Sequence, residues 1–167
     1  GAPTRMWMDW VLSAVFGVEE RLSSSSADRI FDRIAECLPK DEFRPRALFD
    51  RFNIEVLATT ESPLDPLDHH RGIRESGWSG RVITAYRPDP VVDPDYEGFA
   101  GNVALLGEMT GEDTQSWRGY LAAHCKRRSF FKSMGATSTD HGHPTARTEN
   151  MSETAAAALF AKVLSGD

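Results

Sequence analysis

Three side chains that can bind metals lie within four positions near the end of the sequence. Asp140, His141 and His143 occur in "GATSTDHGHPTAR", directly after a short stretch that predicts a β-strand. Imidazoles on alternate residues of an extended segment face the same side, and imidazole and carboxylate groups both bind zinc. The alternative is a loop held by hydrogen bonds, in which Asp140 caps a turn and His143 lies in solvent. The stretch alone leaves both interpretations open.

A second candidate for chemistry is Arg87, which ends the apolar stretch "RVITAYRPD". A guanidinium at the end of a strand can bind a carboxylate or a phosphate through two parallel hydrogen bonds. The alternative is an ion pair with Asp89 or another acidic neighbour. Thr59 and Thr60 end the apolar stretch "NIEVLATT" and can donate hydrogen bonds to a polyol, although threonine is common in strands for packing reasons.

The elements that must position these residues alternate between helix and strand. Apolar residues at helical spacing, Ser at candidate N-caps, and Gly or Pro at the ends predict the helices. Short runs rich in β-branched residues predict the strands. The expected helices are 23–38, 43–52, 67–76, 96–108, 114–134 and 152–164, and the expected strands are 53–60, 81–89 and 136–142.

Strands separated by helices imply parallel pairing, and hence an α/β fold. We expect an N-terminal helical segment, residues 1–52, and a strand-and-helix segment, residues 53–167, within a single compact unit. Polar residues follow all three predicted strands, as "TTESP", "YRPD" and "TDHGH". Because the carboxyl ends of parallel strands lie at one edge of a sheet, that edge is the predicted site.

Composition excludes several classes of partner. The formal charge is −6, with both signs interspersed among the 26% of charged residues, so the basic surface of a nucleic-acid binder is absent. Nucleic acid is therefore not an expected partner. A membrane is not expected either, because no stretch has the length and apolarity of a membrane span. Cys37 and Cys125 lack the spacing of a metal site or a disulfide framework, which favours a reducing cytoplasm.

Other aromatic and imidazole side chains are expected to be structural. Trp7, Trp10 and Phe16 lie in a mildly apolar N-terminal stretch and are predicted to be core residues. His69 and His70 lie in a helical stretch of charged residues, which predicts a solvated helix face.

Taken together, the strand ends resemble one family. "FNIEVLATTESPLDPLDHH", "RVITAYRPD" and "GATSTDHG", in this order, are similar to the central part of uronate (glucuronate) isomerase, of the amidohydrolase superfamily. The family pattern is N-V/I-E, T-T-D-D-P-x-D-x-L-x-H-H, a strand ending R-P-D and a strand ending S/T-D-H. The resemblance covers nearly the whole chain. Glu61 and Ser62 stand where Asp-Asp is usual, and His143 lies outside the pattern.

The resemblance implies a metal-assisted aldose–ketose isomerase on a (β/α)8 TIM barrel. Such an enzyme converts D-glucuronate to D-fructuronate and D-galacturonate to D-tagaturonate, so the expected partner is a uronic acid sugar. By resemblance, Arg87 is a substrate-binding residue, and Asp140 and His141 are active-site residues that we expect to be catalytic. Thr59 and Thr60 are added as substrate-binding residues because they end a neighbouring predicted strand.

The same resemblance implies that part of the enzyme lies elsewhere. Family ligands for the divalent metal, zinc or manganese, come from the first, fifth and eighth strands, whereas this chain resembles strands two to four. We therefore expect an incomplete barrel that binds no metal and is inactive alone. Exposed strand edges predict a homo-oligomer. The alternatives are a stand-alone metal-dependent hydrolase or isomerase using Asp140, His141 and His143, and a non-catalytic sugar-acid binding or interaction module.

Overall fold

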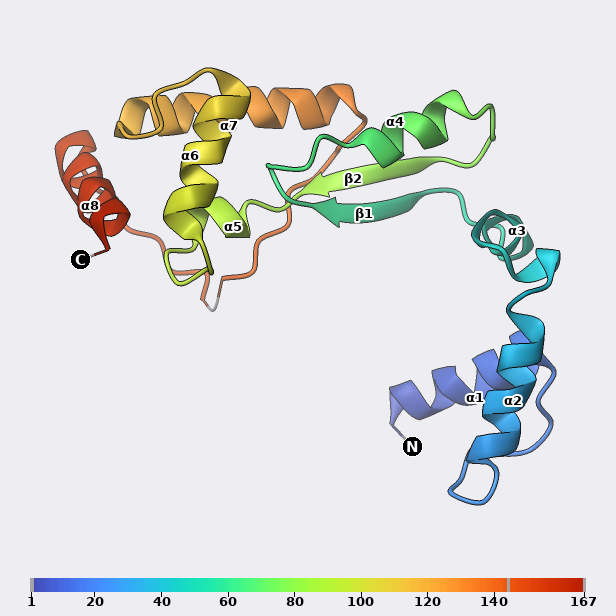
Figure 1. The fold of residues 1–167 in the computed structure, drawn as a ribbon. Helices are drawn as coiled ribbons and strands as arrows, with labels where there is room; N and C mark the ends of the chain where they lie inside the picture. Colours follow the sequence, from blue (N-terminus) through green and yellow to red (C-terminus); the bar gives the residue numbers. More distant parts are fainter. Residues whose placement is uncertain (1, 144, 167) are drawn as a thin grey trace. The chain divides into compact units, whose positions relative to one another are not determined.

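The computed structural model describes residues 2–143 and 145–166 (Figure 1). Their contacts divide the chain into two compact units, one ending at Glu55 and the other beginning at Val56. The predicted boundary, after residue 52, lies slightly before this observed boundary. That the two units fold as a single domain stays a prediction. Each unit is described by itself.

The N-terminal unit is helical. It consists of α1 (Pro3–Phe16), α2 (Ala27–Cys37), the 3-10 turn η1 (Asp41–Phe43) and α3 (Pro45–Arg51). Proline stands in the first turn of α1 and of α3, where its missing N–H costs no helical hydrogen bond. The core of this unit contains Leu12, Val18 and Ile30, with Phe16, Leu22 and Ile34 packed against them.

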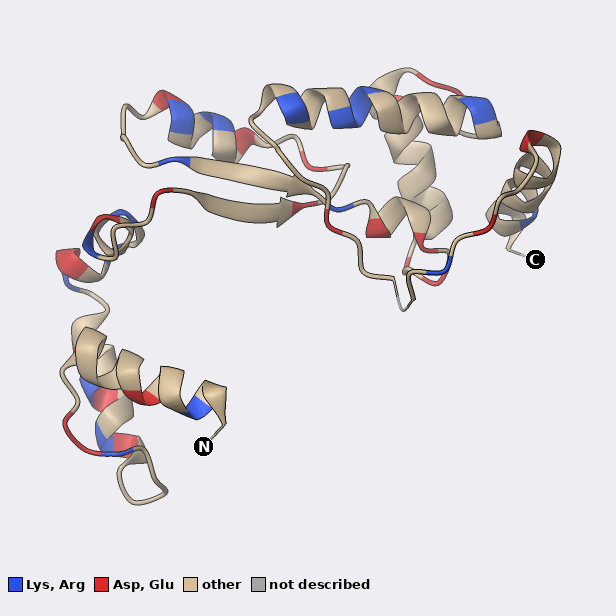
Figure 2. Cartoon of the chain, turned by 180° about the vertical axis from the view of Figure 1, so that it is seen from behind, with Lys and Arg blue, Asp and Glu red and all other residues tan. Residues whose placement is uncertain are grey.

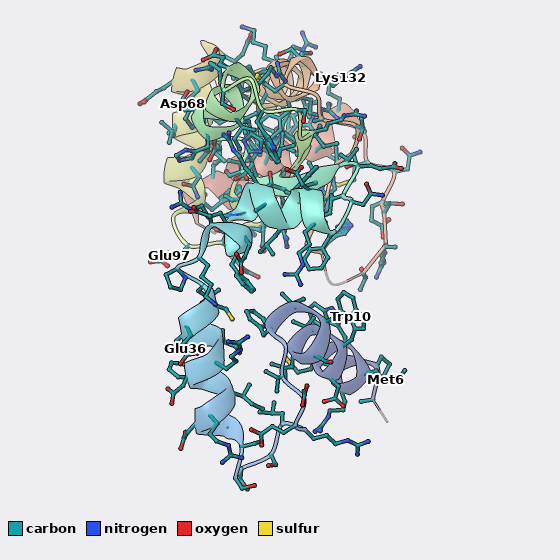
Figure 3. All side chains as sticks on the ribbon, turned by 90° about the vertical axis from the view of Figure 1, so that its right-hand side faces the viewer. Met6, Trp10, Glu36, Asp68, Glu97 and Lys132 are labelled. Atoms are coloured by element: carbon teal, nitrogen blue, oxygen red, sulfur yellow. The ribbon has the colours of Figure 1, made fainter. Side chains whose placement is uncertain are left out.

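Two tryptophans of α1 lie outside this core. Trp7 is 65% exposed and Trp10 is 54% exposed, so the prediction that both are core residues is wrong. Figure 3 shows Met6 and Trp10 as side chains extending from α1. The helix is apolar on more than one side, and only the face that carries Leu12 meets the small core. Phe16 does pack inside, stacked on Phe43 with ring centroids 5.5 Å apart.

The C-terminal unit contains a two-stranded parallel sheet among its described residues. β1 (Leu57–Glu61) pairs with β2 (Val82–Tyr86), in a register that places Glu61 opposite Tyr86. The connection between them includes α4 (Asp68–Glu75), as parallel pairing requires. The predicted α/β class with parallel strands is confirmed, and the two strand ends lie level at one edge (Figure 1).

The third predicted strand, residues 136–142, is reduced to one isolated parallel bridge between Thr139 and Tyr86. The N–H of Tyr86 donates to Ser138 O, 3.2 Å away, and the N–H of Asp140 donates to Tyr86 O, 3.0 Å away. The ladder does not continue towards residue 142, because β2 ends at Tyr86. The N–H of Arg87 already donates to Glu61 O, and Pro88 has no N–H to donate.

Helices form the remainder of the C-terminal unit. They are α5 (Asp89–Val92), α6 (Phe99–Thr110), α7 (Trp117–Ser133) and α8 (Glu153–Ser165). Helices α6 and α7 begin three residues later than predicted, at 99 rather than 96 and at 117 rather than 114. The reason for α7 is its cap, because the Ser116 side chain accepts a hydrogen bond from the N–H of Gly119. No helix in the described part of the chain is long and apolar enough to cross a bilayer.

Helix α7 connects the strands to the other helices through two hydrophobic clusters. Its residue Phe131 packs with Tyr86 of β2 in one cluster. Its residue Tyr120 packs with Phe160 of α8 in the other. The first cluster also contains Leu67 and Met134, and the second also contains Val91, Phe99, Val103, Leu106 and Ala123. The orientation of β2 therefore depends on α7.

Candidate functional site

Three of the predicted site residues meet at the carboxyl ends of the strands. Arg87 follows β2, Thr60 lies near the end of β1, and Asp140 follows the bridge at Thr139. Nη1 of Arg87 lies 3.4 Å from Oδ2 of Asp140, and the hydroxyl of Thr60 lies 3.5 Å from the same oxygen. The Arg87 and Asp140 side chains are 46% and 47% exposed, so a ligand in solvent can reach both.

A fourth residue, Asp89, holds Arg87 from the other side. Oδ2 of Asp89 lies 3.3 Å from Nε of Arg87, and Oδ1 accepts a hydrogen bond from the N–H of Gly142 at 2.8 Å. Only 16% of the Asp89 side chain is exposed. The ion pair with Asp89 that the sequence allowed as an alternative is therefore present, and it occurs together with the contact to Asp140.

Arg87 opens into a cavity of about 440 Å³. Its other lining residues are Ser62, Asp89, Pro90, Asp93 and Tyr96. Among the described residues, Nη2 of Arg87 makes no hydrogen bond. Figure 2 shows acidic residues in the segments beyond the strand ends, and Asp89, Asp93 and Asp140 all belong to these segments. The guanidinium thus lies among carboxylates, and its Nη2 has no hydrogen-bond partner among the described residues.

Thr59 does not join this group. Its hydroxyl lies 2.8 Å from Nε2 of His70 on α4, because neighbouring residues of a strand face opposite sides of the sheet. His70 is half-buried, whereas its neighbour His69 is exposed. The solvated face predicted for both histidines therefore holds only for His69. The role of Thr59 in substrate binding stays a prediction.

The histidines after Asp140 lie next to each other without forming a metal centre. The ring centroids of His141 and His143 are 5.6 Å apart, and both line a cavity of about 240 Å³ beside Asp89 and Asp93. Within residues 2–143 and 145–166, no three His, Cys, Asp or Glu side chains are grouped so that they could hold a metal ion. The described residues therefore do not fit the metal site that Asp140, His141 and His143 suggested as an alternative.

A buried histidine that the sequence analysis missed supports the end of β2. The hydroxyl of Tyr86 and Nδ1 of His124 on α7 are 2.7 Å apart. His124 is 8% exposed, and its Nε2 has no partner among the described residues. Burial, together with the charges of Arg128 and His141, lowers the pKa of His124 to about 4, so the ring is neutral at pH 7. Burial also raises the pKa of Tyr86.

The family model for glucuronate isomerase matches residues 1–167, the full length of the chain. The chain belongs to the glucuronate isomerase family. A uronate isomerase of Rhizorhabdus wittichii is 64% identical over 99% of the chain, and one of Mesorhizobium japonicum is 62% identical over 99%. The chain spans about a third of the length of these relatives, 36% and 35% respectively.

Solved structures of this family have the same fold over the matched part. The crystal structure of glucuronate isomerase from Caulobacter crescentus superposes with a TM-score of 0.92 at 54% identity, covering 99% of this chain and 35% of that one. The uronate isomerase from Thermotoga maritima superposes with a TM-score of 0.89 at 31% identity, covering all of this chain and 37% of that one. The arrangement at the strand ends is thus built on the fold of a segment of glucuronate isomerase.

Gly142 is the position in this family segment where an added side chain would disturb the site. A Cβ there would overlap Oδ1 of Asp89 and lie 2.9 Å from Nη2 of Arg87. We expect Gly142→Ala to break the hydrogen bond from residue 142 to Asp89, so hydrogen exchange of that amide should accelerate about tenfold. Gly72→Ala is the control, because its methyl would meet nothing within 4 Å. Equal protection of residue 142 in both variants would contradict the prediction.

Proposed function

We propose that this chain is the part of a uronate isomerase that binds the carboxylate of a uronic acid sugar. The reaction is the conversion of D-glucuronate to D-fructuronate, and of D-galacturonate to D-tagaturonate. One observation supports this proposal more strongly than any other. Arg87 lies at the carboxyl end of β2 and lines an open cavity, in a chain that matches the family along its whole length.

Aldose–ketose isomerisation moves a proton from C2 to C1 of the sugar through an enediol. The enzyme must therefore grip the sugar, stabilise charge on the oxygens of C1 and C2, and supply a base. In this proposal Arg87 binds the carboxylate by charge-assisted hydrogen bonds, and Thr60 donates a hydrogen bond to a sugar hydroxyl. Asp140 and His141 lie at the same edge and are the residues proposed to carry the proton.

The rest of the catalytic apparatus is assigned to parts of the family protein other than this segment. We propose that the chain supplies strands two to four of a (β/α)8 barrel. We do not assign the divalent metal implied by the family to this segment, because the described residues contain no group of side chains that fits it. Alone, the chain is expected to bind the sugar without turning it over. Homo-oligomerisation and a cytoplasmic location remain predictions.

A chimera tests this proposal. The segment of the Rhizorhabdus wittichii relative that matches the chain is replaced by residues 1–167, and the isomerisation of D-glucuronate is measured. We expect the chimera to be active. Arg87→Ala in the chimera should lower kcat/KM about 10-fold to 100-fold, because charge-assisted hydrogen bonds to the substrate contribute about 1.5–3 kcal/mol.

The matched control is Arg71→Ala, which removes an exposed guanidinium paired with Asp68 on α4. It should change kcat/KM less than about twofold. A folded chimera without isomerase activity would contradict the proposal. If such a chimera still bound glucuronate, the non-catalytic sugar-acid module would be the better description.

A further inference from the structure

The two carboxylates that contact Arg87 are held very differently. Asp89 lies in the first turn of α5, is 16% exposed, and has both oxygens engaged, one by Nε of Arg87 and one by the N–H of Gly142. Asp140 is 47% exposed, and its described contacts, to Nη1 of Arg87 and to Thr60, are long at 3.4 and 3.5 Å. Asp89 is therefore fixed, whereas Asp140 can leave at little cost.

The geometry of a guanidinium makes this difference important. Its two terminal nitrogens form a fork that matches the two oxygens of a carboxylate. In Arg87, Nη2 has no described hydrogen-bond partner, and one of the two N–H groups of Nη1 donates to Asp140 over a long 3.4 Å. A ligand carboxylate that binds across both nitrogens brings its own oxygen next to the Asp140 carboxylate at Nη1, while the contact between Asp89 and Nε can remain.

Charge leads to the same conclusion. Arg87 contributes one positive charge, whereas Asp89 and Asp140 contribute two negative charges, and Asp93 lines the same cavity as Arg87 and Asp89. A third carboxylate on Arg87 would be repelled by Asp140 as long as that residue stayed in place. A neutral sugar has no charge with which to displace it.

We propose that Asp89 is the positioning residue that keeps Arg87 turned towards the cavity, and that the sugar's carboxylate displaces Asp140 from Arg87. This inference rests on the proposed function. Displacement makes the site selective for acidic sugars, because only an anion can replace the negative charge that Arg87 loses when Asp140 moves away. It also frees the carboxylate of Asp140 beside the bound sugar, where Thr60 remains its neighbour.

Titration of the purified chain with D-glucuronate, followed by NMR, tests the two roles. Asp140→Asn removes the competing charge and should tighten binding about fivefold, the size expected for a partly exposed ion pair. Asp89→Asn should weaken binding about fivefold, because Arg87 loses its fixed partner. Asparagine keeps an oxygen for the N–H of Gly142, so the loop can retain its conformation.

Two controls separate competition from general electrostatics. Asp93→Asn removes a charge from the same cavity at a residue without a described contact to Arg87, and should tighten binding less than about twofold. D-glucose should compete with glucuronate in none of the variants. Equal tightening by Asp93→Asn and Asp140→Asn, or weaker binding after Asp140→Asn, would overturn the inference.

The same titration distinguishes failure of the inference from failure of the proposed function. Glucuronate binding that Arg87→Ala abolishes, but that changes in the wrong direction in Asp140→Asn, contradicts only the displacement of Asp140. A folded wild-type chain that shows no Arg87-dependent binding contradicts both, because the carboxylate would then have another site or none in this segment.

Discussion

Replacing Arg127 with methionine is expected to lower the free energy of unfolding by about 3 kcal/mol. Arg127 is 8% exposed on α7, and it donates from Nε to Pro63 O at 2.6 Å and from Nη2 to Asp65 O at 2.8 Å. Methionine fills similar space without donors, so the two carbonyls of the β1–α4 connection lose charge-assisted partners. Urea unfolding monitored by fluorescence measures the change.

The neighbouring arginine provides the matched control. Arg128 lies on the same helix, is exposed, and makes only a long contact of 3.5 Å with Sγ of Cys125 among its described hydrogen bonds. Arg128→Met should change the free energy of unfolding by less than about 0.5 kcal/mol. If the two variants lost equal stability, the connection after β1 would not depend on Arg127.

Acidification from pH 7 to pH 4 is expected to lower the free energy of unfolding by up to about 3 kcal/mol through His124 alone. Burial lowers the pKa of this histidine from 6.5 to about 4 in the folded chain. Between these pH values the unfolded state binds more protons than the folded state. The contribution is therefore fully present above pH 6.5 and is lost as the pH falls towards 4.

Urea unfolding of wild type and His124→Asn at pH 7, 5 and 4 isolates this effect. Asparagine has its amide near the position of Nδ1, so it can still bond the hydroxyl of Tyr86, but it does not titrate. The free energy of unfolding of this variant should therefore fall less between pH 7 and 4. Other titratable groups that contact or influence His124 include Tyr86, Tyr120, Arg128 and His141. His69→Asn, at an exposed histidine, should retain the wild-type pH dependence. The same change in the free energy of unfolding with pH in all three proteins would contradict the assignment of this effect to His124.

Local sequence patterns predicted most of the secondary structure of the C-terminal unit. The β-branched runs before Thr60 and Arg87 became β1 and β2, because such residues favour extended backbone, although β1 is largely exposed and only β2 has a buried end. The run after Gly135, ATSTDHG, contains Thr137 and Thr139 but no Val, Ile or aromatic residue, and only Thr139 bridges to β2. Such a run has a weak local preference for a strand, because it has little apolar side chain to pack on a sheet face.

Burial was harder to predict than periodicity. Trp7 and Trp10 were expected inside because they lie in an apolar stretch, but both are more than half exposed and lie outside the core of the N-terminal unit. His70 was expected on a solvated face, and it contacts Thr59 instead. Burial depends on which other element packs against a helix face, and the sequence of the helix alone does not show this.

By itself, the sequence determined the family, the parallel order of the strands, and the meeting of Thr60, Arg87 and Asp140 at one edge. Strand order and side-chain alternation are local or topological properties, so residue types and spacing are enough to establish them. Only the tertiary structure decided that Asp89 fixes Arg87 while Asp140 stays loosely held, and that His124 supports Tyr86. These contacts join residues distant in the chain or depend on rotamers and burial, so they follow from packing.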